Sequence, residues 1–161
     1  RPARLEDVAR VQQLFAKTNQ FNMTTRRYGI GEVENFVSSD RYSLGLASAR
    51  DRYGDLGIIG VYLLNLTGEN VEVDSFLMSC RALGRGIETV LMNALKADVK
   101  LTRSRGLLVA RFIPTRKNAA AAGFFESQGL RAVAESPAGE VVFRVSVQTI
   151  EFIDIPHIRL T

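Results

Sequence analysis

The stretch from Val71 to Leu91 constrains the fold of this 161-residue chain more than any other part. Residues 71–78 alternate between two sets of side chains with the period of a strand, and residues 87–99 repeat apolar side chains at the spacing of a helix. Gly84 and Gly86 lie between these two patterns. The stretch therefore predicts a strand, a glycine turn and a helix in direct succession.

The glycine turn has the chemistry of an anion site. Glycines let the backbone approach a ligand closely, and a helix N-terminus offers unpaired N–H groups and the positive end of its dipole. The residues that would form this phosphate-binding cradle are Arg81, Ala82, Leu83, Gly84, Arg85 and Gly86. A plain tight turn remains the alternative at this stage.

The only cysteine, Cys80, directly precedes this turn. A lone cysteine is most often a small buried hydrophobic residue. A helix N-terminus together with Arg81 and Arg85 nearby would instead favour the reactive thiolate. Both readings stay open on the residues alone. A single cysteine also excludes an internal disulfide and fits a reducing, cytoplasmic compartment.

Composition narrows the class of protein. The chain is 46% hydrophobic and 24% charged, which is typical of one globular domain, and its net charge of +4 suits an anionic ligand or an acidic partner. The basic residues form no long run, which argues against nucleic-acid binding, and no apolar run reaches membrane-spanning length. Because the chain starts at Arg1 without a Met, we expect residues 1–161 to be one domain of a longer protein.

The remaining patterns predict the rest of the fold. We expect helices over residues 5–17, 31–39 and 118–128, the last with Asn118 as N-cap and Gly129 after its end, and strands over residues 42–49, 57–66, 106–113, 130–135 and 140–148. Residues 1–4 would be the end of a truncated first strand. The prediction is an α/β (α+β) domain with a mixed, mostly antiparallel sheet. Residues 71–79 and 106–113 would form its central parallel pair, with helices on both faces.

The Arg-x-x-Gly-x-Gly spacing of residues 81–86 resembles the pyrophosphate loop of GNAT-fold acyltransferases, which hold acyl-CoA by its pantetheine and phosphates. The order of elements fits a GNAT domain that lacks most of its first strand. Four segments, residues 14–28, 51–55, 76–86 and 114–118, further resemble the GNAT-like C-terminal domain of the FkbH-like family. The Thr-Asn-Gln-Phe-Asn run at residues 18–22 is the most specific of them.

The FkbH-like resemblance implies a function. Members of this family join a HAD-type phosphatase domain to a GNAT-like domain and divert 1,3-bisphosphoglycerate into polyketide biosynthesis. The glyceryl unit is loaded as a thioester on an acyl carrier protein, by way of an enzyme cysteine that Cys80 matches. The resemblance thus implies an acyltransferase whose partners are an acyl carrier protein and a HAD-type phosphatase domain in the same or a neighbouring chain.

The same resemblance implies the other site residues. Asn19 and Asn118 would join Cys80 in catalysis, and a 3-phosphate would bind Arg26. Substrate contacts would come from Gln20, Asn22, Thr25, Arg26 and Thr115. We expect no metal and no tightly bound cofactor, with the phosphopantetheine arm of the carrier or coenzyme A as the ligand. His157, the only histidine, is a candidate general base, although a lone histidine near a terminus is more often a surface residue.

Two departures from these families keep alternatives open. The Asp-x-Asp-Thr motif of HAD phosphatases is absent, so we expect no phosphatase activity from this chain. Phe125 stands where GNAT enzymes commonly use a tyrosine to protonate the leaving CoA thiolate. An acetyl-CoA-dependent N-acetyltransferase and a non-catalytic domain that docks a carrier protein remain the rival functions.

Overall fold

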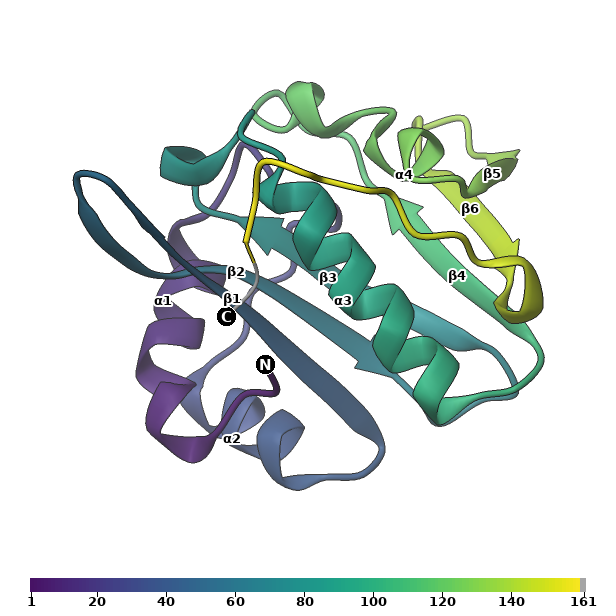
Figure 1. The fold of residues 1–161 in the computed structure, drawn as a ribbon. Coiled ribbons are helices and arrows are strands. Elements are labelled where there is room, and N and C mark those ends of the chain that lie inside the picture. Colours follow the sequence, from purple (N-terminus) through teal and green to yellow (C-terminus); the bar gives the residue numbers. More distant parts are fainter. Residues whose placement is uncertain (160–161) are drawn as a thin grey trace.

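The computed structural model describes residues 1–159, which form a six-stranded sheet in the order β1-β2-β3-β4-β6-β5 (Figure 1). All neighbouring strands are antiparallel except β3 and β4, which are parallel. This confirms the predicted fold class. The strands are β1 Tyr42–Asp51, β2 Gly54–Asn65, β3 Val71–Met78, β4 Leu107–Phe112, β5 Arg131–Glu135 and β6 Val141–Ser146.

Helices cover both faces of the sheet, as predicted: α1 and α2 lie on one face and α3 on the other (Figure 1). Successive residues of a strand point to opposite faces. Leu64 accordingly packs in the core under α3, and its neighbour Leu63 packs in the core under α1 and α2. The helices are α1 Val8–Lys17, α2 Ile30–Ser38, α3 Ile87–Thr102 and α4 Phe124–Ser127. Short 3₁₀ turns are η1 Leu5–Asp7, η2 Cys80–Ala82, η3 Ala119–Ala121 and η4 Val147–Thr149.

The parallel pair separates soon after it forms. Strands β3 and β4 are paired only from Val71 opposite Leu108 to Val73 opposite Ala110. Parallel strands need a crossover connection, and the sixteen residues of α3 supply it. The prediction that residues 71–79 and 106–113 lie side by side and parallel is confirmed.

A segment from the α1–α2 connection fills the gap between the separating strands. We call Phe21–Thr24 the wedge segment; all four residues are buried. The Met23 N–H donates to the Phe76 carbonyl (3.1 Å), and the Met23 carbonyl accepts from the Ile113 N–H (2.8 Å). The wedge segment therefore bonds both strands, and the sheet is continuous across the splay.

The prediction of one continuous helix over residues 118–128 is wrong. Instead of one helix over residues 118–128, the chain forms η3 and the four-residue helix α4, because Gly123 adopts a left-handed conformation (φ +77°) that interrupts the helical path. The Asn118 side chain makes no helix cap. Gly129 does follow the end of α4 in a left-handed conformation (φ +89°), as expected.

The two ends of the described chain are tied to the fold. The Ala3 N–H donates to the Leu44 carbonyl of β1 (2.8 Å), and Pro2 forms an isolated antiparallel bridge with Gly45. After η4 the chain runs back along α3 (Figure 1, yellow). The Asn93 amide exchanges two hydrogen bonds with the backbone of Ile153, at 2.7 and 3.1 Å.

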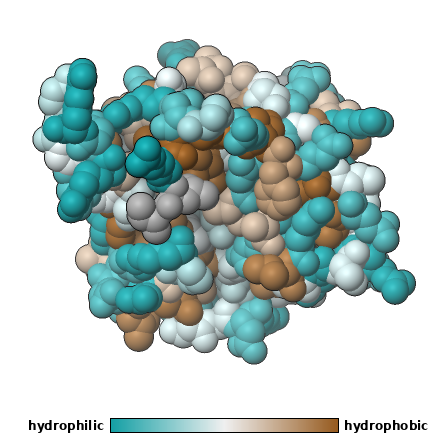
Figure 2. All heavy atoms as spheres, viewed as in Figure 1, coloured by the Kyte–Doolittle hydropathy of each residue, from teal (hydrophilic) through white to brown (hydrophobic). Residues whose placement is uncertain are grey.

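On the face that carries α3, hydrophilic and apolar residues are interspersed (Figure 2). The helices described within residues 1–159 include none that is both long and apolar enough to cross a membrane.

Candidate functional site

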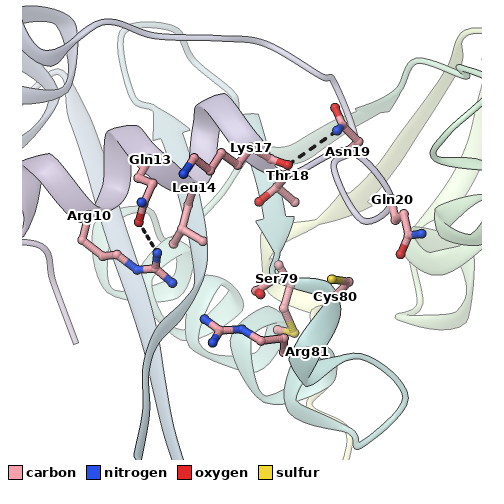
Figure 3. Close-up of a pocket in the computed structure, with 11 residues that line it drawn as sticks. Arg10, Gln13, Leu14, Lys17, Thr18, Asn19, Gln20, Ser79, Cys80 and Arg81 are labelled. Carbon is pink, nitrogen blue, oxygen red and sulfur yellow. Dashed lines mark hydrogen bonds between the residues drawn. The ribbon is translucent and has the colours of Figure 1, made fainter.

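Cys80 is exposed and begins the η2 turn, two residues after the last residue of β3. Of the two readings that the sequence left open, the exposure of the thiol argues against a buried hydrophobic cysteine. The cysteine lines a pocket of about 470 Å³ between the C-terminal half of α1 and the turn that follows β3 (Figure 3). Its position therefore allows a small molecule to reach the sulfur.

The pocket is basic and polar. It contains three cationic side chains and no carboxylate. Four residues predicted for the site, Asn19, Gln20, Cys80 and Arg81, meet here. The full lining is Arg10, Gln13, Leu14, Lys17, Thr18, Asn19, Gln20, Met78, Ser79, Cys80 and Arg81.

The contribution of α1 to this pocket was not predicted from the sequence. Arg10, Gln13 and Lys17 follow one another at spacings of three and four, which places them along one stripe of the helix. The spacing was visible in the sequence, but polar residues at this spacing also form the solvent-exposed face of an ordinary helix. Only the packing of α1 beside Cys80 identifies the stripe as a pocket wall.

Arg10 is a fixed cation. Its Nε and one Nη donate to the Ile58 carbonyl of β2, at 3.2 and 2.9 Å, and its other Nη donates to the Gln13 side chain. A guanidinium group has five N–H donors, so two remain after these three bonds. The strand and the helix together therefore hold a preorganised positive charge at the pocket.

The glycine loop between η2 and α3 presents backbone donors, as predicted, but fewer than expected. Gly84 and Gly86 both adopt left-handed conformations, with φ of +73° and +82°. The N–H groups of Ala82 and Leu83 are already bonded within the η2 turn, to Ser79 and Cys80. Within residues 1–159, the N–H groups from Gly84 to Glu88 donate no hydrogen bond, so the cradle is reduced to these five donors.

The charges around the glycine loop are mixed. Arg85 pairs with Asp51 of the β1–β2 hairpin (2.9 Å). The pKa of Asp51 lies below its usual range because the Tyr53 N–H and the Arg85 guanidinium both donate to the carboxylate. Glu88 adds a carboxylate in the first turn of α3, with one oxygen buried and unpartnered among the described residues. Arg85 is therefore less available to an anion than the sequence suggested.

His157 lies against the glycine loop and not at Cys80. Its Nε2 is 3.1 Å from the Arg85 carbonyl oxygen, and a Cβ added at Gly86 would lie 3.3 Å from the same nitrogen. The structure therefore gives His157 a role in covering the loop. It does not bring the ring to the pocket lining.

Three residues predicted for catalysis or substrate binding hold loops together instead. The Asn118 amide donates to the carbonyls of Asn22 and Ile113 (both 2.9 Å), and its oxygen accepts from Thr115. Asn118 and Asn22 are fully buried, and Asn22 bonds the backbone of Thr18 and Thr25. The side-chain atoms of Asn22 and Asn118 are engaged inside the protein, which corrects the expectations that Asn22 contacts substrate and that Asn118 takes part in catalysis. Thr115 is exposed, but its hydroxyl is bonded within the same turn, to Asn118 and the Lys117 N–H.

Arg26 is also placed away from Cys80. It forms an ion pair with Asp74, which lies six residues before Cys80, roughly 20 Å along an extended chain. The Tyr28 hydroxyl donates to the same carboxylate (2.6 Å), and burial together with this bond raises the pKa of Tyr28 to about 12. The neighbouring Thr25 has a left-handed backbone (φ +55°) and donates its N–H to Asn22. The structure does not unite Thr25 and Arg26 with the pocket.

No family model matches the sequence, and no curated protein matches it. Solved structures, however, share its fold. The GNAT domain of S. lividans PAT is 18% identical, with 91% of this chain and 88% of that chain covered and a TM-score of 0.69. The ribosomal-protein-S18-alanine N-acetyltransferase from Escherichia coli is 9% identical over 99% of this chain and 97% of its own, with a TM-score of 0.68.

The chain has the GNAT fold. A third structural neighbour, Rv2747 from Mycobacterium tuberculosis, was solved in complex with CoA and NLQ; it is 17% identical over 85% of this chain and 74% of its own, with a TM-score of 0.63. At these identities the likeness establishes the fold. The GNAT fold places the glycine loop at the N-terminus of α3 and Cys80 immediately before it.

Proposed function

We propose that this GNAT domain is an acyltransferase that carries its acyl group on Cys80. It would take a glyceryl unit from an acyl phosphate derived from 1,3-bisphosphoglycerate and pass it to the phosphopantetheine thiol of an acyl carrier protein. The observation that supports this most is the position of Cys80, an exposed thiol between a basic pocket and a loop of unpaired N–H groups.

Two thioester steps describe the chemistry. The Cys80 thiolate attacks the carbonyl carbon of the acyl phosphate, the bond from that carbon to the phosphate oxygen breaks, and inorganic phosphate leaves. The deprotonated thiol of the carrier then attacks the Cys80 thioester. The acyl group moves to the carrier, and the Cys80 thiolate is restored.

The glycine loop supplies the binding energy for the carrier in this proposal. The free N–H groups from Gly84 to Glu88 suit the phosphate of a phosphopantetheine arm, because helix N-termini favour anions. A HAD-type phosphatase domain in the same or a neighbouring chain would remove the remaining phosphate, since this chain has no motif for that reaction.

The second candidate is an acetyl-CoA-dependent N-acetyltransferase, which the GNAT fold and the CoA complex of a neighbour favour. One observation opposes it: Phe125 is buried, with its ring packed between Phe76 and Phe143 (centroids 6.1 and 5.7 Å), and it has no proton to donate to a leaving thiolate. The third candidate is a docking domain without catalysis, in which the loop merely holds the carrier's arm.

Intact-protein mass spectrometry separates the three functions. The protein is incubated with 1,3-bisphosphoglycerate, then with carrier protein and a HAD phosphatase. Acyl transfer predicts a mass increase on this chain that is absent in Cys80→Ser, followed by acylated carrier. Acetylation of an amine from acetyl-CoA that persists in Cys80→Ser would favour the N-acetyltransferase. Carrier binding without any acyl adduct would leave the docking domain.

A further inference from the structure

The Cys80 pocket carries a concentration of positive charge that the proposed transfer chemistry does not use. Arg10, Lys17 and Arg81 line the same cavity, and none of its eleven lining residues is acidic. Figure 3 shows the charged ends of these three side chains on one side of the pocket, with Cys80 on the other. Such a cavity suits a small ligand whose anionic group binds the cations while its electrophilic carbon, some distance away, lies at the Cys80 thiol.

Two of these cations are free to bind. Within residues 1–159, neither the Lys17 amine nor the Arg81 guanidinium forms a hydrogen bond or an ion pair, and both residues are exposed. Arg10, by contrast, is fixed by the Ile58 carbonyl and Gln13, with two N–H donors remaining. Unpaired cations that share a pocket repel one another, and a bound dianion relieves this repulsion.

We infer that Arg10, Lys17 and Arg81 form a subsite for the terminal phosphate of a small acyl donor, separate from the glycine loop. Arg10 and Arg81 offer guanidinium forks that match phosphate oxygens, and Lys17 adds a mobile third charge. This inference deepens the proposed function and rests on it for the identity of the donor. It moves the phosphate contact from Arg26, which is paired with Asp74, to residues that line the cavity of the thiol.

Protection of Cys80 from alkylation tests the subsite without requiring acyl transfer. Iodoacetamide modifies the single cysteine, and the rate is followed by intact mass in the presence of 3-phosphoglycerate, glycerate or inorganic phosphate. We expect 3-phosphoglycerate to slow alkylation of the wild-type protein at far lower concentrations than glycerate does. Equal protection by the two compounds, or none by 3-phosphoglycerate, would overturn the inference.

Charge variants locate the contact. Lys17→Gln and Arg81→Gln should each weaken protection by 3-phosphoglycerate roughly tenfold or more, because each removes a charge-assisted hydrogen bond. Lys17→Arg should retain most of it. Arg105→Gln is the matched control, since this exposed arginine follows the far end of α3, about 24 Å from the glycine loop for a sixteen-residue helix.

Two further variants distinguish the possible sites. If Arg26→Gln loses protection while Lys17→Gln and Arg81→Gln keep it, the phosphate binds at Arg26. Loss in Gly84→Val alone would move it to the glycine loop. Either result overturns the subsite. If instead protection follows Lys17 and Arg81 while no acyl adduct ever forms on Cys80, the subsite holds and the proposed acyl transfer fails.

Discussion

The backbone N–H of Met78 donates to the carbonyl of Phe21 across 2.9 Å, at the point where β3 has already parted from β4. Where two strands of a sheet separate, the backbone N–H and C=O groups that face the gap are normally unpaired and open to other chains or ligands. Here the wedge segment forms hydrogen bonds with these groups of β3. The edge of β3 is therefore satisfied from within, and a ligand that reaches Cys80 meets side chains of the pocket in place of a free strand edge.

Shortening Phe21 should destabilise the whole domain. Its side chain is buried, and its ring contacts those of Phe124 and Phe76 at centroid distances of 5.0 and 6.2 Å. Phe21→Ala should cost about 3–5 kcal/mol, the usual cost of an aromatic deletion in a core. Urea unfolding measures this change. Leu101→Ala, at a side chain that is 88% exposed, should stay within about 0.5 kcal/mol of the parent, and equal losses in both variants would contradict a buried role for the wedge segment.

Cys80→Ser should keep the melting temperature and lose the acyl-enzyme. The thiol is exposed, so the substitution removes little packing, but a serine hydroxyl is a far weaker nucleophile at neutral pH. Thermal unfolding and intact mass after incubation with 1,3-bisphosphoglycerate are the two measurements. Normal loading of the carrier protein by Cys80→Ser would remove Cys80 from the mechanism.

Gly84→Val should weaken binding of a phosphopantetheine arm at a modest cost in stability. A Cβ at Gly84 would touch no protein atom within 4 Å, but the left-handed backbone (φ +73°) should cost a side chain about 1–2 kcal/mol. The added side chain would project beside the free N–H groups. Gly129→Val is the matched control, because Gly129 is equally open and also left-handed (φ +89°) but follows α4. Titration calorimetry with carrier protein should show weaker binding only for Gly84→Val.

Asn118→Asp should be severely destabilising although it preserves shape. The amide nitrogen donates to two carbonyl oxygens, and a carboxylate oxygen in its place would face both with no proton to share. Each orphaned buried group costs about 1–3 kcal/mol, so for the two carbonyls we expect a total of about 2–6 kcal/mol by chemical denaturation. The exposed Gln148 provides a similar amide-to-acid change, Gln148→Glu, that should be nearly neutral. Wild-type stability in Asn118→Asp would mean that the amide does not hold these loops.

Tyr28 should make the fold sensitive to alkali. Burial and the bond to Asp74 raise the pKa of its hydroxyl from 10.0 to about 12, so the folded state retains a proton that the unfolded chain loses. A raised pKa gives stability that is complete below pH 10 and is lost as the pH rises through about 12. Tyr28→Phe should therefore lose less stability than the parent between pH 10 and 12. The ultraviolet absorbance of tyrosinate should also show no titration step near pH 12 in Tyr28→Phe. If the titration curve of this variant matched that of the parent, the step near pH 12 would belong to another group.

The sequence predicted the elements that have a clear period. The alternation of residues 71–78 and the helical repeat of residues 87–99 appear as β3 and α3, and the two glycines between them adopt the left-handed conformations that the turn requires. The parallel partner of β3 followed from the length of the crossover. Cys80 could be singled out as a candidate because it follows a predicted strand and precedes the glycine turn.

The burial of the wedge segment and the lining of the pocket could not be predicted from the sequence, because both depend on contacts between distant parts of the chain. Phe21 and Met23 flank a polar residue in a run of amides and hydroxyls, which favours a solvated loop until a splayed sheet offers them a buried place. The structural role of Asn118 could not be predicted, because the two carbonyls that its amide holds are 96 and 5 residues away in sequence. The stripe of Arg10, Gln13 and Lys17 lines the pocket only because α1 packs beside the turn after β3.

The wedge segment also fixes an order of events during synthesis. Met23 bonds Phe76 and Ile113, so its burial requires strands that are made about 50 and 90 residues later. Contacts of such long sequence separation form slowly, because a long loop must close before they contribute. Until residue 113 has left the ribosome, the gap between β3 and β4 that buries Phe21 and Met23 does not exist. The nascent chain therefore exposes these two side chains to other hydrophobic surfaces. A growing chain of this protein should therefore bind chaperones through its α1–α2 connection and release them only when β4 is complete.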